Sequence, residues 1–263
     1  MIVLYFSQIV TFVFILFSSC TTVNMRHSTV SIKVSNLEIP SPIPKEEIVH
    51  HTAYTLSYNK FYKQANWVAY VLTASETKPS FKRTNKFTKD PLIKNTDLAI
   101  DYKKSGYDRG HLAPAGDMEW SATIVKESFY YSNMSPQDPA FNRGVWKKLE
   151  EQVRAWAIAY DSVYVVTGPI LADGLKTIGR DKVSVPNYFY KVILTYTNGN
   201  YNGIGFIMPN KGSKESHQQF AISIDSVETV THIDFFPALP NNIENKVESK
   251  ANALSWNWGK ESK

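Results

Sequence analysis

Apolar residues recur at intervals of three or four positions in the segment that follows Gly144. Val145, Leu149, Val153 and Trp156 hold these positions, and lysine, glutamate and arginine fill much of the sequence between them. Residues three or four apart share one side of an α-helix, so this spacing places the apolar side chains on a single face. The pattern predicts an amphipathic helix that begins near Gly144 and packs on a core.

Runs of strand length, either continuously apolar or alternating, occur before and after this helix. They cover residues 54–58, 67–72, 161–166, 188–196 and 201–208. Asn198-Gly199-Asn200 separates the last two runs, and an Asn-Gly pair between apolar runs is typical of a tight hairpin. Because strands and helices do not alternate regularly, the order favours a mostly antiparallel α+β architecture over a parallel βαβ arrangement.

The C-terminal part of the chain is expected to complete the same domain. Asp234-Phe235-Phe236-Pro237 is followed by a polar helix predicted over residues 242–253, and Trp256 and Trp258 are expected to pack back onto the domain. Hydrophobic residues make up 43% of the 263 residues and aromatic residues 13%, which is ample material for one large core. We therefore predict a single domain over residues 47–263.

The N-terminal segment has the pattern of an export signal. Residues 2–17 are almost entirely apolar and carry no charge, and they run into Ser18-Ser19-Cys20. This pattern predicts a signal peptide over residues 1–19, favoured over a permanent membrane anchor because the run is short and polar sequence follows it. No Lys or Arg precedes the run, which departs from the usual pattern.

Cys20 lies where a bacterial lipoprotein signal places its lipidated cysteine. We therefore expect a membrane-anchored bacterial lipoprotein, either periplasmic or on the cell surface, with simple secretion as the alternative. Residues 20–46 are polar and contain Pro40, Pro42 and Pro44, a composition that predicts a flexible tether. Because Cys20 is the single cysteine, an intramolecular disulfide is excluded.

The charge of the chain favours a polyanionic partner without identifying one. The formal net charge is +5, and residues 1–19 contain no charged side chain, so removal of the signal would leave the charge unchanged. A basic surface attracts nucleic acid, but lysines spread evenly over a surface give the same count. The six histidines and one cysteine form no Cys-x-x-Cys or His-Glu-x-x-His pattern, which argues against a closed structural zinc site and against a zincin.

Asp108-Arg109-Gly110-His111, followed by Asn133 and Asn142, is the strongest candidate for chemistry. A neutral imidazole at His111 can take a proton from water, and Arg109 can bind phosphate with two parallel hydrogen bonds. Asp108 could hold the loop through internal hydrogen bonds. The amide oxygen of Asn142 is a hard ligand that suits Mg²⁺, although an Asn just before a helix is usually an N-cap.

The sequence closely resembles the DNA/RNA non-specific endonuclease family, the ββα-metal nucleases with a His-Me finger motif. The resemblance covers about residues 48–248 and rests on five ordered motifs. They are Trp67-Val68-Ala69-Tyr70, Tyr107-Asp108-Arg109-Gly110-His111-Leu112-Ala113-Pro114, Ser132-Asn133-Met134-Ser135-Pro136-Gln137, Asn142-Arg143-Gly144-Val145-Trp146 and Asp234-Phe235-Phe236-Pro237.

The resemblance implies a role for each matching residue. His111 would activate water, Asn142 would bind magnesium directly, with Mn²⁺ as a substitute ion, and Arg109 would lie near the phosphate. Asn133 would position the site through hydrogen bonds, and Glu150 would face water bound to the metal. Arg83 resembles an arginine that stabilises transition-state charge, in a loop whose spacing varies within the family. We also expect Gln137 to bind substrate.

The activity implied by the resemblance is hydrolysis of DNA and RNA that leaves 5′-phosphate ends. A site built around phosphate and metal contacts the backbone that all sequences share, so low sequence specificity follows. A non-catalytic nucleic-acid-binding lipoprotein and a phosphodiesterase for another polyanion or a small ester are the alternatives. A homodimer is among the partners that the sequence leaves open.

Two further groups of residues have other interpretations. Ser213 and His217 suggest a serine hydrolase, but no Gly-x-Ser-x-Gly elbow is present, which argues against that class. For His50 and His51, the apolar and aromatic surroundings in the sequence favour a packed or hydrogen-bonded role over metal binding.

Overall fold

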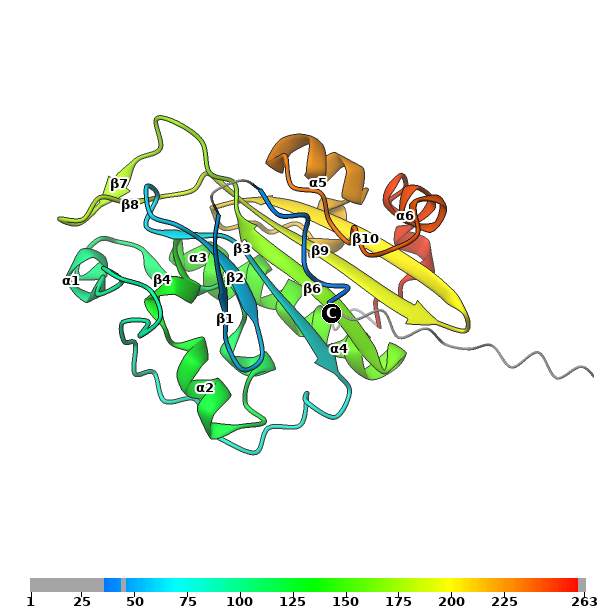
Figure 1. Cartoon of the computed structure of the whole chain (residues 1–263), viewed down its shortest axis with the longest axis horizontal. Helices are drawn as coiled ribbons and strands as arrows, with labels where there is room; N and C mark the ends of the chain where they lie inside the picture. Colours follow the sequence, from blue (N-terminus) through cyan, green and yellow to red (C-terminus); the bar gives the residue numbers. More distant parts are fainter. Residues whose placement is uncertain (1–35, 44–45, 260–263) are drawn as a thin grey trace, which may run out of the picture. The chain divides into compact units, whose positions relative to one another are not determined.

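A seven-stranded antiparallel sheet is the centre of the computed structural model, which describes residues 36–43 and 46–259 (Figure 1). The strand order is β1-β2-β3-β6-β9-β10-β11, and every neighbouring pair is antiparallel. The strands are β1 (Glu47–His50), β2 (Thr55–Asn59), β3 (Gln64–Thr73), β6 (Ser162–Pro169), β9 (Tyr188–Thr197), β10 (Asn200–Pro209) and β11 (Ala221–Ile222). The predicted antiparallel α+β architecture is confirmed.

Short helices and two small sheets surround this sheet. The helices are α1 (Ala99–Tyr102), α2 (Ala122–Ser128), α3 (Pro139–Phe141), α4 (Lys147–Tyr160), α5 (Ile224–Thr231) and α6 (Asn241–Glu248). The small sheets pair β4 (Asp108–His111) with β5 (Met134–Gln137) and β7 (Thr177–Ile178) with β8 (Val183–Ser184). None of the helices in the described part of the chain has the length and apolarity needed to cross a membrane.

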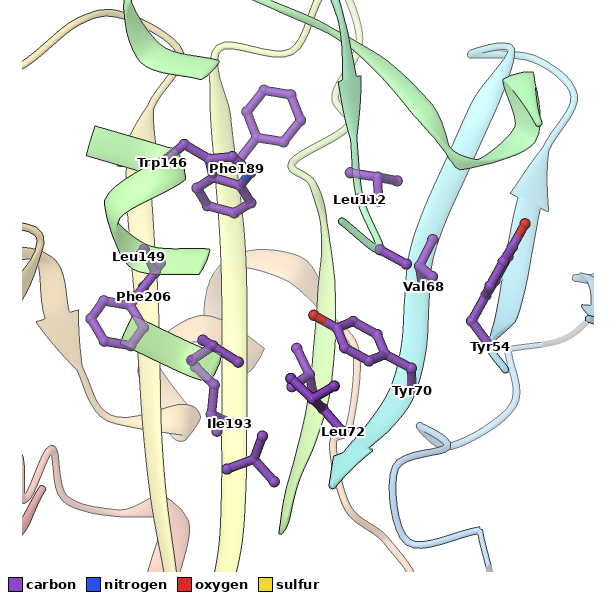
Figure 2. Packing of buried hydrophobic residues seen from close by; sticks show 14 of the residues in the cluster. Tyr54, Val68, Tyr70, Leu72, Leu112, Trp146, Leu149, Phe189, Ile193 and Phe206 are labelled. Carbon is purple, nitrogen blue, oxygen red and sulfur yellow. The ribbon is translucent and has the colours of Figure 1, made fainter. Parts of the chain in front are cut away.

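The large sheet has a hydrophobic core on each face, because successive side chains of a strand point to opposite sides. On one face, Tyr70 of β3 and Ile193 of β9 share a core with Leu149 of α4, as Figure 2 shows. On the other face, Trp67 of β3 and Val192 of β9 share a core with residues of α5 and α6. The sheet therefore lies between α4 on one side and the pair α5 and α6 on the other.

The predicted helix and hairpin are both present. Leu149, Val153 and Trp156 of α4 are completely buried, as the spacing of apolar residues requires. In the hairpin between β9 and β10, Asn198 and Gly199 have φ angles of 52° and 80°. Positive φ at both central residues fits the turn type that matches the right-handed twist of paired strands, and Gly adopts it without strain.

The packed structure begins before residue 47, where we expected it to start. The signal peptide and Cys20 lie outside the described residues, as does most of the predicted tether. Within the described part, however, Leu37 is 1% exposed, and the Ser41 amide donates to the Asp234 carbonyl over 2.9 Å. Residues 36–43 therefore pack against the segment containing Asp234-Phe235-Phe236-Pro237.

The C-terminal residues follow the prediction in part. The polar helix is shorter than expected, since α6 ends at Glu248, and residues 253–255 form a separate helical turn. Trp256 and Trp258 pack on Trp156, with ring centroids 4.4 and 5.0 Å away. Their predicted return to the domain is confirmed.

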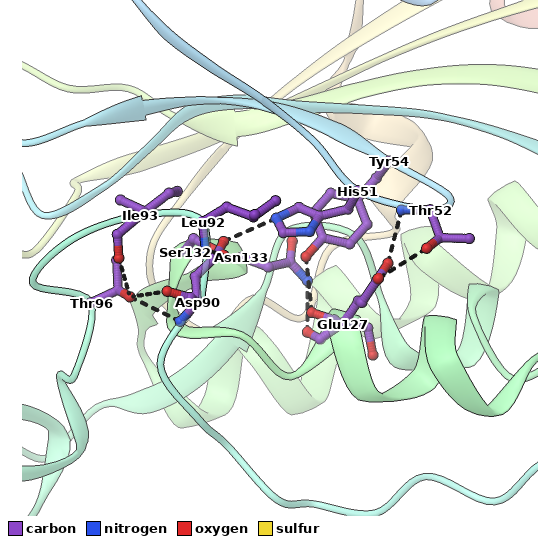
Figure 3. Close-up of polar contacts among 11 residues, drawn as sticks. His51, Thr52, Tyr54, Asp90, Leu92, Ile93, Thr96, Glu127, Ser132 and Asn133 are labelled. Carbon is purple, nitrogen blue, oxygen red and sulfur yellow. Dashed lines mark hydrogen bonds and ion pairs between the residues drawn. The ribbon is translucent and has the colours of Figure 1, made fainter.

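His51 belongs to a buried hydrogen-bond network, shown in Figure 3. Its Nε2 atom lies 2.9 Å from Asp90 Oδ2, and Ser132 Oγ donates to the same oxygen over 2.5 Å. Burial alone would raise the pKa of Asp90, but the hydrogen bonds from His51 and Ser132 outweigh it and lower that pKa. The hydrogen-bonded role predicted for His51 is confirmed, and exposed His50 contacts Thr55 Oγ1 over 3.0 Å.

Candidate active site

Asp108-Arg109-Gly110-His111 forms the strand β4 rather than the loop we expected. It pairs with β5 so that Gly110 lies opposite Ser135 and His111 opposite Met134. A Cβ atom on Gly110 would overlap the side chain of Gln137, so the strand accepts no larger residue at this position without rearrangement. Asp108 and Gln137 form the other end of the ladder. Together, β4, β5 and the helical segment from Asn142 form a ββα unit.

His111 lies against aromatic rings at the end of β4. The ring centroids of Phe129 and Phe87 are 4.8 and 5.8 Å from its imidazole. Burial, followed by the nearby positive charge of Arg83, lowers the pKa of His111 to about 3. Its Nε2 atom has no hydrogen-bond partner among the described residues. His111 is therefore a neutral imidazole at physiological pH with one nitrogen available to accept a proton.

The side-chain amide of Asn142 is held by Asp108. Nδ2 of Asn142 donates to Asp108 Oδ2 over 2.9 Å, which leaves Oδ1 as the atom available to a ligand. Arg143 donates to both carboxylate oxygens of Asp108, over 2.6 and 2.8 Å. Although burial alone would raise it, these hydrogen bonds lower the pKa of Asp108. Asp108 is thus an ionised clamp between β4 and the helix.

Asn142 is not the helix N-cap. Asp138 has that role, since its Oδ1 atom accepts hydrogen bonds from the amides of Ala140 and Phe141. Asn142 begins a five-residue π-helical turn, Asn142–Trp146, which contains a kink at Gly144 and leads into α4. Such widened turns are frequent at functional sites. The alternative interpretation of Asn142 as a helix N-cap is therefore wrong.

Glu150 is a partly buried residue of α4 that faces the same region. Burial raises the pKa of Glu150 to about 8, while the positive charges of Lys191 and Arg154 oppose that rise. The negative charge of Asp117 raises the pKa of Glu150 further. Asp117 forms an ion pair with Arg154, which donates to it over 2.7 Å. Glu150 therefore lies in a low-dielectric site with nearby cations.

Asn133 holds the chain directly after His111. Its Oδ1 accepts from the amide of Ala113, and its Nδ2 donates to the carbonyls of Ala113 and Ser128, all over 2.8–2.9 Å. The side chain is fully buried, and Asn133 is not one of the pocket-lining residues. Asn133 therefore fixes the backbone that follows His111, and its catalytic positioning role remains a prediction.

The remaining predicted residues separate into two groups. Arg83 and Arg109 both line the pocket, with their guanidinium groups 5.7 Å from the ring of Phe129 and 5.0 Å from that of Phe87, respectively. Gln137 is fully buried beneath Gly110 and does not line the pocket. In this arrangement Gln137 does not reach the pocket, where the predicted contact with substrate would take place.

The pocket itself is an open depression of about 560 Å³. It brings together five cationic side chains, two acidic ones, His111 and Asn142. Its lining consists of Arg83, Phe87, Asp108, Arg109, His111, Pro114, Ala115, Gly116, Asn142, Arg143, Lys147, Glu150 and Arg154. An excess of positive charge around a neutral base suits a phosphodiester.

Three of these cations were not predicted from the sequence. Arg143 clamps Asp108, Lys147 lies at the start of α4, and Arg154 pairs with Asp117. The spacing of Arg154 four residues after Glu150 was a usable signal, because residues four apart lie on the same side of a helix. The partner Asp117 lies 37 residues away in sequence, so the ion pair itself could not be found by spacing.

Comparison with known proteins agrees with this geometry. The family model for DNA/RNA non-specific endonucleases matches residues 35–242. The chain belongs to this family. The Danio rerio mitochondrial nuclease EXOG is 36% identical over 72% of this chain and 60% of its own length. Nuclease C1 of Cunninghamella echinulata var. echinulata is 35% identical over 78% of this chain and 88% of its own.

The similarity to known nucleases extends from the sequence to the fold. A chain from the crystal structure of the EndoG/EndoGI complex superimposes with a TM-score of 0.70 and 32% sequence identity. The match covers 74% of this chain and 88% of that chain. The chain thus spans about three fifths of the Danio rerio EXOG sequence but most of the EndoG chain.

Proposed function

We propose that this protein is a magnesium-dependent endonuclease that hydrolyses phosphodiester bonds of DNA and RNA with little sequence specificity. The observation that carries this proposal is the shared pocket of neutral His111 and clamped Asn142 among five cationic side chains. Family membership and the named nucleases among its relatives support the same activity.

The residues of the pocket fit a magnesium ion. Mg²⁺ prefers oxygen ligands and retains several waters, so one protein oxygen together with phosphate oxygens can form a sufficient site. Asn142 would hold the ion through Oδ1, whose orientation is set by the hydrogen bond from Nδ2 to Asp108. When bound, Mg²⁺ supplies positive charge to the scissile phosphate and the leaving 3′ oxygen.

The protein side chains then divide the remaining work. His111 accepts a proton from the attacking water, and its lowered pKa keeps it in the neutral form that a base requires. Arg109 and Arg83 bind the phosphate oxygens, where negative charge increases in the transition state. Departure of the 3′ oxygen would leave a phosphate on the 5′ end of the product.

Digestion of plasmid DNA and of RNA tests this function directly. We expect nicking and degradation with Mg²⁺, none with EDTA, and a rate about a thousandfold lower with His111→Ala. Salt-sensitive binding of nucleic acid without turnover under every divalent ion would instead support the non-catalytic lipoprotein. Full cleavage by His111→Ala protein would overturn the mechanism.

We further propose that the protein is exported and anchored by a lipid on Cys20. The proposal rests on the uncharged apolar run over residues 2–17 and the small residues before Cys20. Growth with a labelled fatty acid should label the wild-type chain and leave Cys20→Ala unlabelled. Equal labelling of both chains, or its absence from both, would remove the anchor from the proposal.

A further inference from the structure

Three carboxylates converge on the face of the large sheet that lies away from α4. Asp225 and Glu228 belong to α5, and Glu248 is the last residue of α6. One carboxylate oxygen from each of the three residues lies within 4.8 Å of the other two. Both helices pack on the same hydrophobic core of this face (Figure 1). The cluster therefore brings together side chains from two helices that are separate in sequence.

The surroundings of this cluster offer little compensation for negative charge. None of the three carboxylates forms an ion pair with another described residue. Glu228 accepts a hydrogen bond at Oε1 from the amide of Phe235, over 2.7 Å. Asp234 and Glu244 add further negative charge nearby. Carboxylates at this spacing repel one another unless a proton or a cation lies among them.

Glu248 differs from an ordinary acidic residue of a protein surface. It is only 4% exposed, and its Oε1 atom has no hydrogen-bond partner among the described residues. A buried carboxylate oxygen without a partner is costly, and a bound ion is one way to satisfy it. Glu248 also ends α6, where the helix dipole disfavours negative charge and favours a cation. The burial and the position of Glu248 therefore both favour a positively charged ligand beside its carboxylate.

The spacing of the carboxylate oxygens fits a calcium ion. Ca²⁺ binds oxygen at about 2.3–2.6 Å, so two ligands of one ion lie at most about 5 Å apart. The separations of 4.8 Å or less meet this limit. Asp225 is exposed and Glu228 is half-buried, so water can complete the coordination. Mg²⁺ demands a stricter octahedron and is usually held by one or two carboxylates, which favours Ca²⁺ for three.

We propose that Asp225, Glu228 and Glu248 form a calcium site that links α5 to α6. Burial and neighbouring carboxylates raise the pKa of Glu248 in the absence of an ion, and Ca²⁺ would take the place of that proton because it relieves the same repulsion. The large sheet lies between this site and the pocket that contains His111 and Asn142. The ion would stabilise the packing of the two helices, so the proposal does not depend on nuclease activity.

Thermal unfolding with and without Ca²⁺ tests the site. The full chain carries Asn142→Ala in this experiment, so that the ligand proposed for the pocket cannot account for the result. At about pH 8 and constant ionic strength, about 10 mM Ca²⁺ should raise the melting temperature of chelator-treated protein by about 3–10 °C, the range expected for an ion at about 10–100 times its dissociation constant. The same concentration of Mg²⁺ should have a smaller effect.

Two glutamine variants separate a specific site from a general excess of negative charge. Glu248→Gln removes a proposed ligand, whereas Glu244→Gln, its matched control on the same helix, removes the same charge outside the three carboxylates. The rise in melting temperature with Ca²⁺ should disappear in the first variant and largely persist in the second. In chelator, Glu248→Gln should melt no lower than its parent, because it loses only an unpaired buried acid, so a lost response would not reflect misfolding.

Equilibrium dialysis with radioactive Ca²⁺ counts the bound ions directly in the wild-type chain. Chelator-treated wild-type protein should bind one ion more per chain than Glu248→Gln, whether or not the pocket also binds Ca²⁺. Equal binding by these two chains, no rise in melting temperature, or equal loss of the rise in both glutamine variants would overturn the proposal. A larger rise with Mg²⁺ than with Ca²⁺ would overturn the choice of calcium.

Discussion

The two faces of the large sheet gather different ionisable side chains. On the α4 face, the pocket contains five cationic side chains, and Asp108, the acidic clamp, is bound by Asn142 and Arg143. On the opposite face, Asp225 and Glu228 of α5 and Glu248 of α6 place carboxylate oxygens within 4.8 Å of one another.

The two faces differ in the direction in which the surroundings shift the pKa of an acidic side chain. Hydrogen bonds lower the pKa of Asp108, so it remains charged. For Glu248, burial is the largest effect, and the carboxylates around it, with Glu228 and Glu244 foremost, raise its pKa further, to about 9. On one face of the sheet, hydrogen-bond partners stabilise the ionised form of an acidic side chain. On the other face, burial and neighbouring carboxylates favour the protonated form.

The largest expected effect is the loss of the base on the α4 face. His111→Ala should reduce the rate of plasmid cleavage by about a thousandfold, the scale typical of general-base removal. Glu248→Gln on the opposite face serves as the control and should cleave at the wild-type rate. Comparable losses in the two variants would show that the faces are not functionally separate.

Removal of the clamp should have a smaller effect than removal of the base. Asp108→Asn keeps the size of the side chain but removes the charge that binds Asn142 and Arg143. We expect activity at limiting Mg²⁺ to fall about 10–100-fold and to recover in part at high Mg²⁺, as for other residues that orient a metal ligand. A magnesium titration of the rate measures this, and an unchanged titration curve would contradict the clamp.

On the opposite face, the expected effect concerns stability. A glutamate in the unfolded chain titrates near 4.5, whereas folded Glu248 holds its proton to about pH 9. The protein should therefore lose stability as pH rises from about 4.5 to about 9, because the unfolded chain releases this proton first. Glu248→Gln removes that loss and should raise the melting temperature at pH 8 by about 2–4 °C, with no change at pH 4.

The smallest effect is expected from Arg83. Its charge is the second cause, after burial, of the lowered pKa of His111. Arg83→Ala should raise the pKa of His111 but leave it below its usual value of 6.5, since burial persists. Proton NMR of the imidazole during a pH titration measures the change. A pKa that stays at the wild-type value would show that Arg83 does not act on the base.

Sequence periodicity predicted the elements that bury regular apolar faces. The spacing of Leu149, Val153 and Trp156 identified α4, and the apolar runs identified β3, β6, β9 and β10. The edge strand β1 was missed, because it has four residues of which Val49 alone is buried. The helix α5 was missed as well, although Ser223 caps it by accepting from the amide of Ser226.

Local sequence was least informative where a contact joins distant residues. Asp108–His111 has no apolar alternation, so its strand conformation depends on pairing with β5. Asp138-Pro139 was a usable capping signal that would have moved the helix start ahead of Asn142. The environment of Lys191 could not be predicted, because a charged residue within an apolar run does not reveal which helix covers it.

The packing of the two C-terminal tryptophans has a consequence for shortened versions of the protein. The family match ends at residue 242, yet the carbonyl of Asn257 accepts hydrogen bonds from Gln152 and Trp156 of α4. A fragment cut at residue 242 would leave the indole of Trp156 open to water at the far end of the helix that carries Glu150. The last described residues therefore stabilise this end of α4, and the region matched by the family model is shorter than the part of the chain that packs together.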